Sequence, residues 1–264
     1  MSTFRQVAIS FLKSINLYSA VTSLLRPEHL SEAERMQRRR MQDFYSQFIK
    51  KGDLCFDVGA NLGSRTDVFL RLGARVVAVE PQDHAFICLE KKFTRNRRLT
   101  LLKRGLSDHI GYVDLHIANV STISTMAEDW KSAVISSGRF PSDKYNWTQV
   151  VTVPVTTLDQ LIERYGLPVF IKIDVEGYEL PVLRGLSRPV SCLSFEFTPE
   201  FMDSTMQCVA HLTTLGEVQF NFCLGESMMF SLPNWVVGDM LCNHLSGLPH
   251  GSLFGDVYAR FGDA

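Results

Sequence analysis

The hydrophobic positions of this chain change their spacing near Gly52, and from there on short apolar runs alternate with segments of helical periodicity. Short bounded apolar runs are typical of buried strands, and we interpret the segments between them as helices. The predicted strands are 54–58, 76–79, 99–102, 169–174 and 190–197, and the predicted helices are 64–72, 81–93 and 179–186. This alternation predicts an α/β fold, with a mostly parallel, Rossmann-like sheet covered by helices on both faces.

Two further pairs of strands are expected outside this alternation. Segments 112–117 and 150–155 mix polar and apolar residues, and we interpret them as strands that flank a substrate-facing insertion. Segments 218–224 and 256–261 are expected to form a closing pair of strands. The stretch 228–255 is rich in Met, Trp, His and Gly, and its role is open.

The first 52 residues have a different texture and are expected to be helical. We expect residues 1–52 to form an N-terminal helical extension that acts as a lid or a dimer contact. Residues 53–264 are expected to form one domain. A helix is predicted to begin near Ser31, because Ser31 and Glu34 have the spacing of a capping box. A homo-oligomer formed through these helices is part of the expectation.

Composition then limits the class of protein. With 264 residues, 45% of them hydrophobic, and a net charge of −1, the chain is typical of a soluble globular domain. The near-neutral charge disfavours a nucleic-acid partner. The six scattered cysteines, the lack of a membrane-spanning run and the lack of a signal-peptide pattern favour a cytoplasmic protein. Basic clusters at 35–40 and 91–104 are interpreted as solvated faces, with an acidic substrate, a membrane surface or RNA as alternatives.

A glycine-rich turn follows the first predicted strand and carries a carboxylate. Asp57, Gly59, Asn61 and Gly63 alternate along the segment that leads from this strand into a helix. A carboxylate there would repel a pyrophosphate and suits an ammonium group, which S-adenosylmethionine carries. Glu80, at the end of the second strand, is suited to accept both ribose hydroxyls. NAD stays an alternative, because Glu80 alone fits either cofactor.

Three more carboxylates and a lysine gather at the ends of later strands. Asp174 and Glu176 follow the fourth strand, and Glu196 is near the end of the next, so all three are expected at one crevice. We expect them to act as a general base or as oxygen ligands for Mg²⁺ or Ca²⁺. Lys172 lies inside an apolar strand and is expected to pair with a carboxylate. Further candidates for base or acceptor contacts are His116, His211, His244, His250, Ser121, Thr122 and Ser124.

The motifs together resemble the FkbM family of S-adenosylmethionine-dependent methyltransferases. The resemblance rests on segments 56–63, 79–81, 153–159, 171–179 and 183–185. It implies a seven-stranded class I methyltransferase fold and methyl transfer to a hydroxyl oxygen of a sugar, glycan or polyketide-type small molecule. By position it places Asp174 and Glu176 beside the transferable methyl group.

The expected cofactor contacts and the competing functions complete the sequence-based picture. The residues expected to bind the cofactor are Asp57, Gly59, Ala60, Asn61, Gly63, Glu80, Pro81, Leu106, Ser107 and Asp174, and those expected to act in catalysis are Lys172, Asp174, Glu176 and Glu196. The alternatives are a non-catalytic protein that binds S-adenosylmethionine and a NAD-dependent oxidoreductase.

Overall fold

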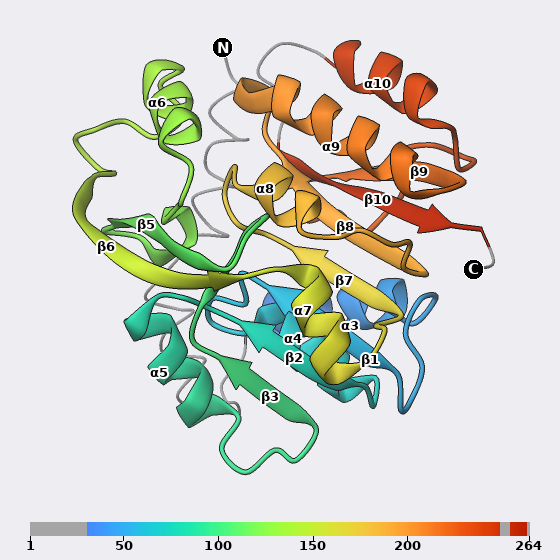
Figure 1. Ribbon diagram of the computed structural model, residues 1–264, viewed down its shortest axis with the longest axis horizontal. Coiled ribbons are helices and arrows are strands. Elements are labelled where there is room, and N and C mark those ends of the chain that lie inside the picture. Colours follow the sequence, from blue (N-terminus) through green and yellow to red (C-terminus); the bar gives the residue numbers. More distant parts are fainter. Residues whose placement is uncertain (1–30, 249–253, 263–264) are drawn as a thin grey trace.

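The computed structural model describes residues 31–248 and 254–262, and its main feature is a seven-stranded sheet (Figure 1). The strand order is β3-β2-β1-β7-β8-β10-β9. The strands are β1 (Leu54–Val58), β2 (Arg75–Val79), β3 (Leu99–Leu102), β7 (Phe170–Ile173), β8 (Cys192–Phe197), β9 (Val218–Leu224) and β10 (Gly255–Phe261). From β3 to β8 neighbouring strands pair in parallel, and β10 is antiparallel to both of its neighbours. The class I methyltransferase fold expected from the resemblance is therefore confirmed.

Helices cover both faces of this sheet, as the parallel strands require. On one face α7 (Leu158–Tyr165), α8 (Glu179–Arg184), α9 (Met202–Leu215) and α10 (Gly238–Ser246) pack on an almost wholly apolar core (Figure 1). On the other face α3 (Glu32–Tyr45), α4 (Ser64–Arg71) and Leu89 of α5 (Asp83–Lys92) pack around Cys55, Phe170 and Tyr258. The closing strand pair predicted from the sequence is present as β9 and β10.

A second, three-stranded sheet contains the insertion that the sequence predicted. It consists of β4 (Gly105–Leu106), β5 (Gly111–Ala118) and β6 (Trp147–Thr156), in the order β4-β6-β5, with β5 and β6 antiparallel. Between β5 and β6 the chain forms the short 3-10 helix η2 (Ser121–Ile123) and the helix α6 (Glu128–Ser136). Another short 3-10 helix, η3 (Pro199–Phe201), precedes α9.

Helix α3 begins with the predicted capping box and packs onto the sheet. The Ser31 hydroxyl accepts from the backbone amide of Glu34, and the Glu34 carboxylate accepts from the backbone amide of Ser31. Its Phe44 and Tyr45 rings are buried against Tyr258 and Phe69 respectively. Residues 1–30 of the expected extension lie outside the described residues. The division at residue 52 and the lid or dimer role stay predictions.

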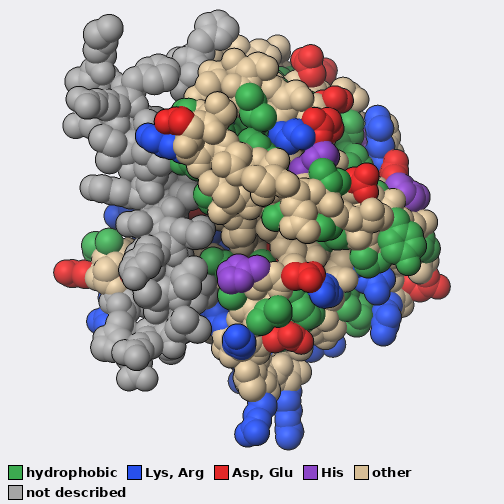
Figure 2. All heavy atoms as spheres, turned by 90° about the vertical axis from the view of Figure 1, so that its left-hand side faces the viewer, with side chains coloured by type: hydrophobic (Ala, Val, Ile, Leu, Met, Phe, Trp, Pro, Cys, Tyr) green, Lys and Arg blue, Asp and Glu red, His purple; other side chains and the backbone are tan. Residues whose placement is uncertain are grey.

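The basic cluster, the cysteines and the helix lengths can be compared with the sequence-based expectations. Lys91, Arg95, Arg97 and Arg98 of the basic cluster are exposed, which agrees with a solvated face. Figure 2 shows Lys and Arg side chains that extend from the lower edge of one side of the molecule, below a surface of mixed character. All six cysteines are free, and four of them are buried. No helix among the described residues is long and apolar enough to cross a bilayer.

Candidate functional site

The predicted site residues meet where the parallel strands end. The glycine turn follows β1, Glu80 follows β2, Asp174 follows β7, and Glu196 is near the end of β8. In an open α/β sheet this edge holds the ligand, most often where the strand order reverses. Here the order reverses between β1 and β7. The glycine turn and Asp174 therefore lie on the two sides of the reversal point.

Gly59 allows the turn after β1 to lie against the start of the turn after β7. Its φ of 79° is in the left-handed region, and a Cβ there would overlap the carbonyl oxygen of Asp174. The two turns are also joined by a hydrogen bond of 2.9 Å, donated by the Asp174 amide to the carbonyl of Val58. Gly63, with φ 75°, caps α4 and leaves no room for a Cβ beside Leu89. These glycines fix the path of the backbone beneath the expected methionine end of the cofactor.

Asp57 is buried at the base of the turn and already has one partner. The hydroxyl of Thr66, on α4, donates a hydrogen bond to its Oδ2. Only 2% of Asp57 is exposed, and burial raises the pKa of its carboxyl above the usual value. A buried carboxylate is suited to gain stabilisation from a cationic ligand. Thr66 is a residue that the sequence analysis missed.

Glu80 is held rigidly by the backbone on both of its oxygens. Oε2 accepts from the Asn61 amide and Oε1 from the Gln82 amide, each at 2.8 Å. Burial raises the pKa of Glu80 to about 7, although these two amides oppose the shift. Since a carboxylate has about four lone-pair positions, two are left for hydroxyl donors such as those of a ribose. The Ser121 hydroxyl donates to the Asn61 side-chain oxygen at 3.1 Å, so the insertion contacts this end of the turn.

Lys92 differs from the solvated face that its sequence neighbours suggest. Its Nζ donates to the carbonyls of Leu62 and Gly63, at 3.0 and 3.1 Å, and lies over the ring of Phe93. Burial lowers the pKa of Lys92 to about 8. The correction follows from helix periodicity: position 92 is three residues after the fully buried Leu89 and shares its side of α5. Lys92 braces the end of the glycine turn.

The remaining expected cofactor residues lie around the same edge. Ala60 is buried within the turn, and Pro81 is half-buried directly after Glu80. Leu106 and Ser107 are fully buried at the end of β4. The Ser107 hydroxyl lies 3.1 Å from the Tyr178 hydroxyl, which connects this end to the turn after β7. Their contact with the adenine stays a prediction.

Lys172 has the carboxylate partner that the sequence predicted, and it also has a second one. It is fully buried on β7, with Nζ 3.2 Å from Asp174 Oδ2 and 2.9 Å from Asp256 Oδ1. Burial alone would lower the pKa of Lys172, but the two carboxylates raise it well above its usual value. Lys172 is therefore a fixed cation below Asp174. Asp256, on β10, was not a predicted site residue.

Asp174, Glu176 and Glu196 form one acidic group, as expected. One carboxyl oxygen from each lies within 4.8 Å of the others. Burial, followed by the charge of Asp174, raises the pKa of Glu176 well above its usual range, and burial with Glu176 and Asp174 does the same for Glu196. One Glu196 oxygen, Oε2, is buried without a hydrogen-bond partner. These pKa directions favour protons held on the two glutamates, and a Mg²⁺ or Ca²⁺ ion stays a prediction.

The turn that carries Glu176 is held from both sides. Glu176 has a left-handed φ of 53°, and Oε1 of Glu179 accepts from the amides of Val175 and Gly177, each at 3.2 Å. From the insertion, the Thr125 hydroxyl donates to the Glu176 carbonyl at 2.6 Å. Burial raises the pKa of Glu179 to about 7. The insertion thus fixes the backbone of a candidate catalytic residue.

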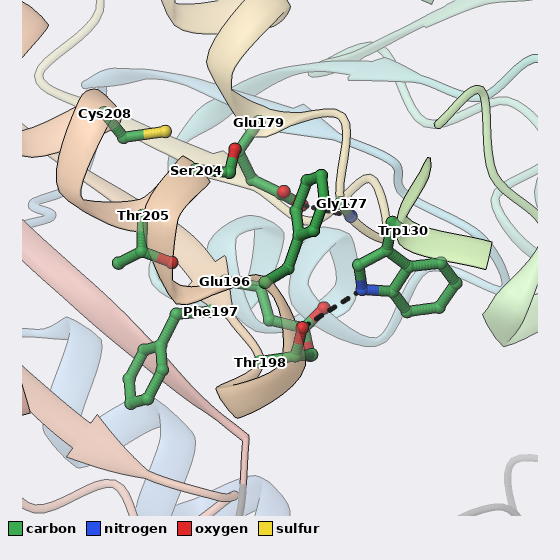
Figure 3. A pocket seen from close by; sticks show the side chains of 10 residues that line it. Trp130, Gly177, Glu179, Glu196, Phe197, Thr198, Ser204, Thr205 and Cys208 are labelled. Atoms are coloured by element: carbon green, nitrogen blue, oxygen red, sulfur yellow. Dashed lines mark hydrogen bonds between the residues drawn. The ribbon is translucent and has the colours of Figure 1, made fainter. Parts of the chain in front are cut away.

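A small pocket opens beside the acidic group (Figure 3). Figure 3 shows Glu196 and Thr198 on one side of it and Glu179 with Gly177 on the other. The Trp130 indole closes one end and donates to the Thr198 hydroxyl at 3.1 Å. The lining residues are Trp130, Gly177, Glu179, Glu196, Phe197, Thr198, Phe201, Ser204, Thr205 and Cys208. Aromatic, hydroxyl and carboxyl groups meet here next to the expected position of the methyl group.

Several of the other base or acceptor candidates have partners outside the acidic cluster, whereas Oγ1 of Thr122 is buried without a hydrogen-bond partner among the described residues. His116 contacts Glu128 at 3.0 Å, and His211 contacts the Leu183 carbonyl at 2.9 Å. Ser124 accepts from the Ala118 amide within the insertion. His250 lies outside the described residues. None of these contacts places a histidine beside Asp174, Glu176 or Glu196. These three carboxyl groups are therefore the central candidates.

Comparison with known proteins adds a family and two kinds of relatives. Residues 57–221 match the model of the methyltransferase FkbM domain. The hexuronic acid methyltransferase AglP of Haloferax volcanii is 25% identical over 149 residues. That alignment covers 55% of this chain and 55% of the relative, so the chain spans about half the length of the curated relative it matches.

Two solved structures with low sequence identity are also similar. An O-methyltransferase from Bacillus cereus in complex with SAH is 14% identical, with a TM-score of 0.46, over 96% of this chain and 91% of that one. A precorrin-6y C5,15-methyltransferase from Geobacter metallireducens is 10% identical, with a TM-score of 0.44, over 84% and 87%. The fold assignment rests on the strand order rather than on these two likenesses.

Proposed function

The chain belongs to the FkbM methyltransferase family, whose methyl donor is S-adenosylmethionine, and we propose that it methylates a hydroxyl oxygen of a sugar-containing or small-molecule acceptor. The observation that carries this proposal is the meeting of three features at one edge of the sheet. These are the glycine turn, the ribose-type carboxylate Glu80, and the acidic group of Asp174, Glu176 and Glu196. The NAD-dependent alternative loses its support, because the matched family is one of methyltransferases.

The proposed cofactor position follows from the charges of the site. Asp57 receives the ammonium of the methionine moiety, and Glu80 accepts hydrogen bonds from the ribose hydroxyls. The turn at Gly59 to Gly63 lets the cofactor approach the backbone closely. This arrangement directs the sulfonium toward Asp174, at the other side of the reversal point.

Our proposed mechanism gives the three carboxyl groups two different tasks. Asp174 has 35% of its side chain accessible, and its Oδ2 lies 3.2 Å from the Lys172 ammonium. It accepts the proton of the acceptor hydroxyl while that oxygen attacks the methyl carbon. The S–CH₃ bond breaks as the O–CH₃ bond forms, and the sulfonium leaves as the neutral thioether of S-adenosylhomocysteine. Glu176 and Glu196, with raised pKa values, hold protons and donate hydrogen bonds to acceptor oxygens.

A sugar-containing acceptor is favoured by two considerations. The pocket beside the acidic group brings together hydroxyl, carboxyl and aromatic side chains, which is the mixture that binds polyols through hydrogen bonds and ring contacts. The curated relative is named for a hexuronic acid substrate. The acceptor of the present chain is proposed by chemical class only.

Cofactor binding is tested by titration calorimetry with S-adenosylmethionine. We expect Asp57→Ala to weaken binding by at least about tenfold, through the loss of a charge-assisted contact. Thr66→Val is the matched control, because it breaks the hydrogen bond between Thr66 and Asp57 while it keeps the carboxylate. Equal affinity in wild type and Asp57→Ala would refute the assigned role of Asp57.

Methyl transfer is tested by release of labelled product from a panel of sugar and small-molecule acceptors with a tritium-labelled methyl donor. We expect Asp174→Asn to lower kcat by about 100-fold, the usual contribution of a general base. Cofactor binding without transfer to any acceptor class would support the non-catalytic alternative instead.

A further inference from the structure

Asp256 lies on the same face of the sheet as the reacting centre, although it is distant in sequence. Asp57 on β1 pairs in register with Lys172 on β7, and Lys172 pairs in turn with Ser194 on β8. On the next strand across, Asp256 of β10 is opposite Glu196 of β8. Residues paired across neighbouring strands point to the same face. Asp256 therefore lies on the same face of the sheet, level with Glu196, and it lies beyond residue 221, where the family match ends.

The contacts of Asp256 are those of a buried, specific ion pair. Asp256 is 7% exposed, and its Oδ1 lies 2.9 Å from Nζ of Lys172. The distance from the same Nζ to Asp174 Oδ2 is longer, at 3.2 Å. The Tyr258 hydroxyl lies 3.5 Å from Asp256 Oδ2. The ammonium is thus shared, and its shorter contact is to the more deeply buried carboxylate.

Because Lys172 is shared between Asp174 and Asp256, the pairing sets the net charge of this group below the expected cofactor position. Lys172 carries one positive charge and contacts two carboxylates, so the ionised trio has a net charge of −1. The charge of Arg65 also acts on Asp256, and Arg65 is itself paired with Glu226 at 2.7 Å. Without the charge of Asp256, Lys172 would neutralise Asp174 alone.

We propose that Asp256 is a positioning residue of the methyl-transfer centre, which shares the Lys172 ammonium so that Asp174 keeps uncompensated negative charge toward the sulfonium of the cofactor. The inference rests on the proposed function, which places Asp174 beside the methyl group. It has a direct consequence: the cationic sulfonium of S-adenosylmethionine binds more favourably than the neutral thioether of S-adenosylhomocysteine, and Asp256 sets part of that difference.

The test compares the affinities for these two molecules and needs no acceptor. Calorimetry at about pH 8 gives the ratio of the two dissociation constants for wild type and for Asp256→Asn, which keeps the size of the side chain, removes its charge and replaces one acceptor oxygen by an amide. We expect Asp256→Asn to lower the preference for S-adenosylmethionine by roughly three- to tenfold, as the loss of one nearby charge implies. A purely structural role would weaken both ligands equally and leave the ratio unchanged, which would overturn the proposal.

Two further variants sharpen the outcome. Glu128→Gln is the control, because it breaks an ion pair with Lys131 on α6, outside the trio, and its ratio should equal that of wild type. Lys172→Met combined with Asp256→Asn removes both buried charges and leaves Asp174 alone at −1. This double variant leaves no unpaired charge at positions 172 and 256, and it should regain the wild-type preference. A preference that stays lost would contradict the charge-sharing role.

The failure of this inference is distinguishable from failure of the proposed function. Wild-type protein that binds neither molecule would refute the proposed function and the inference together. Wild-type protein that prefers S-adenosylmethionine, with an unchanged preference in Asp256→Asn, would refute the role of Asp256 alone.

Discussion

Gly59 is the position where a single methyl group should separate the two halves of the proposed site. With φ at 79°, an alanine there must adopt the left-handed conformation, and its Cβ would overlap the Asp174 carbonyl oxygen. That oxygen belongs to the backbone and cannot rotate away. Real Cβ atoms essentially never come closer than 3.0 Å to another heavy atom. To reach that distance between the alanine Cβ and the Asp174 carbonyl oxygen, the turns after β1 and β7 must separate by roughly 1 Å. The substitution therefore acts on the spacing between the cofactor turn and Asp174.

The chain offers a matched control in Gly52. It also has a left-handed φ, of 95°, but nothing lies within 4 Å of the place that a Cβ would take. Gly52→Ala should therefore cost only the left-handed strain, about 1 kcal/mol in the free energy of unfolding. Gly59→Ala adds overpacking of about 1–3 kcal/mol. The difference between the variants isolates the contact with Asp174.

Thermal unfolding and calorimetry with S-adenosylmethionine measure both effects. We expect Gly52→Ala to bind like wild type, and Gly59→Ala to bind at least about tenfold more weakly, since a misplacement of about 1 Å can cost about 100-fold at a reacting centre. The reasoning is wrong if Gly59→Ala matches Gly52→Ala in both unfolding and affinity.

Three further changes test the buried charges and the helix cap. Because Glu80 has a folded pKa of about 7, above the usual 4.5, the folded state binds the extra proton, and Glu80 alone should account for a loss of up to about 3 kcal/mol of stability as pH rises from 5 to 8. Glu80→Gln should reduce the slope in denaturant titrations at the two pH values, with the contribution of Glu179 left in place, and an unchanged slope would refute the assignment. Lys172→Met alone should lower the free energy of unfolding by about 3–5 kcal/mol, as measured by urea unfolding. The double variant with Asp256→Asn should lose less, and an equal loss in the single and double variants would contradict the pairing. Ser31→Ala should lower stability by about 1 kcal/mol in the same assay if α3 unfolds with the domain, and no loss would show that it does not.

The strands were predictable because their physical signal is local. Residues 54–58 and 99–102 are short apolar runs bounded by polar or glycine-rich segments, and the structure has strands with those bounds. The site carboxylates were predictable for a related reason. Parallel strands bring their carboxyl ends to one edge, so Asp174, Glu176 and Glu196 had to approach each other once the strands were assigned.

The partners of buried polar groups were not predictable, because they depend on contacts between distant segments. The sequence indicated that Lys172 needs a carboxylate, but nothing local identifies Asp256, which is 84 residues away. Register across β8 and β10 decides that contact. Thr66 was missed although it is only nine residues from Asp57, since its hydroxyl reaches the carboxylate only when α4 folds back along β1.

The two faces of the sheet differ in how many buried charges they carry. One face is covered by α7, α8, α9 and α10 over an almost wholly apolar core, whose burial is the main favourable contribution to folding. The other face carries Asp57, Lys172 and Asp256 among its aromatic residues, and each buried charge there opposes folding unless it is paired. The register pair of Asp57 and Lys172 spans the point where the strand order reverses, between β1 and β7, and Asp256 lies two strands further along the same face. A cation bound above Asp57 and Asp174 would compensate negative charge that the protein itself leaves in place. Cofactor binding should therefore relieve a cost that the folded apoprotein carries on this face.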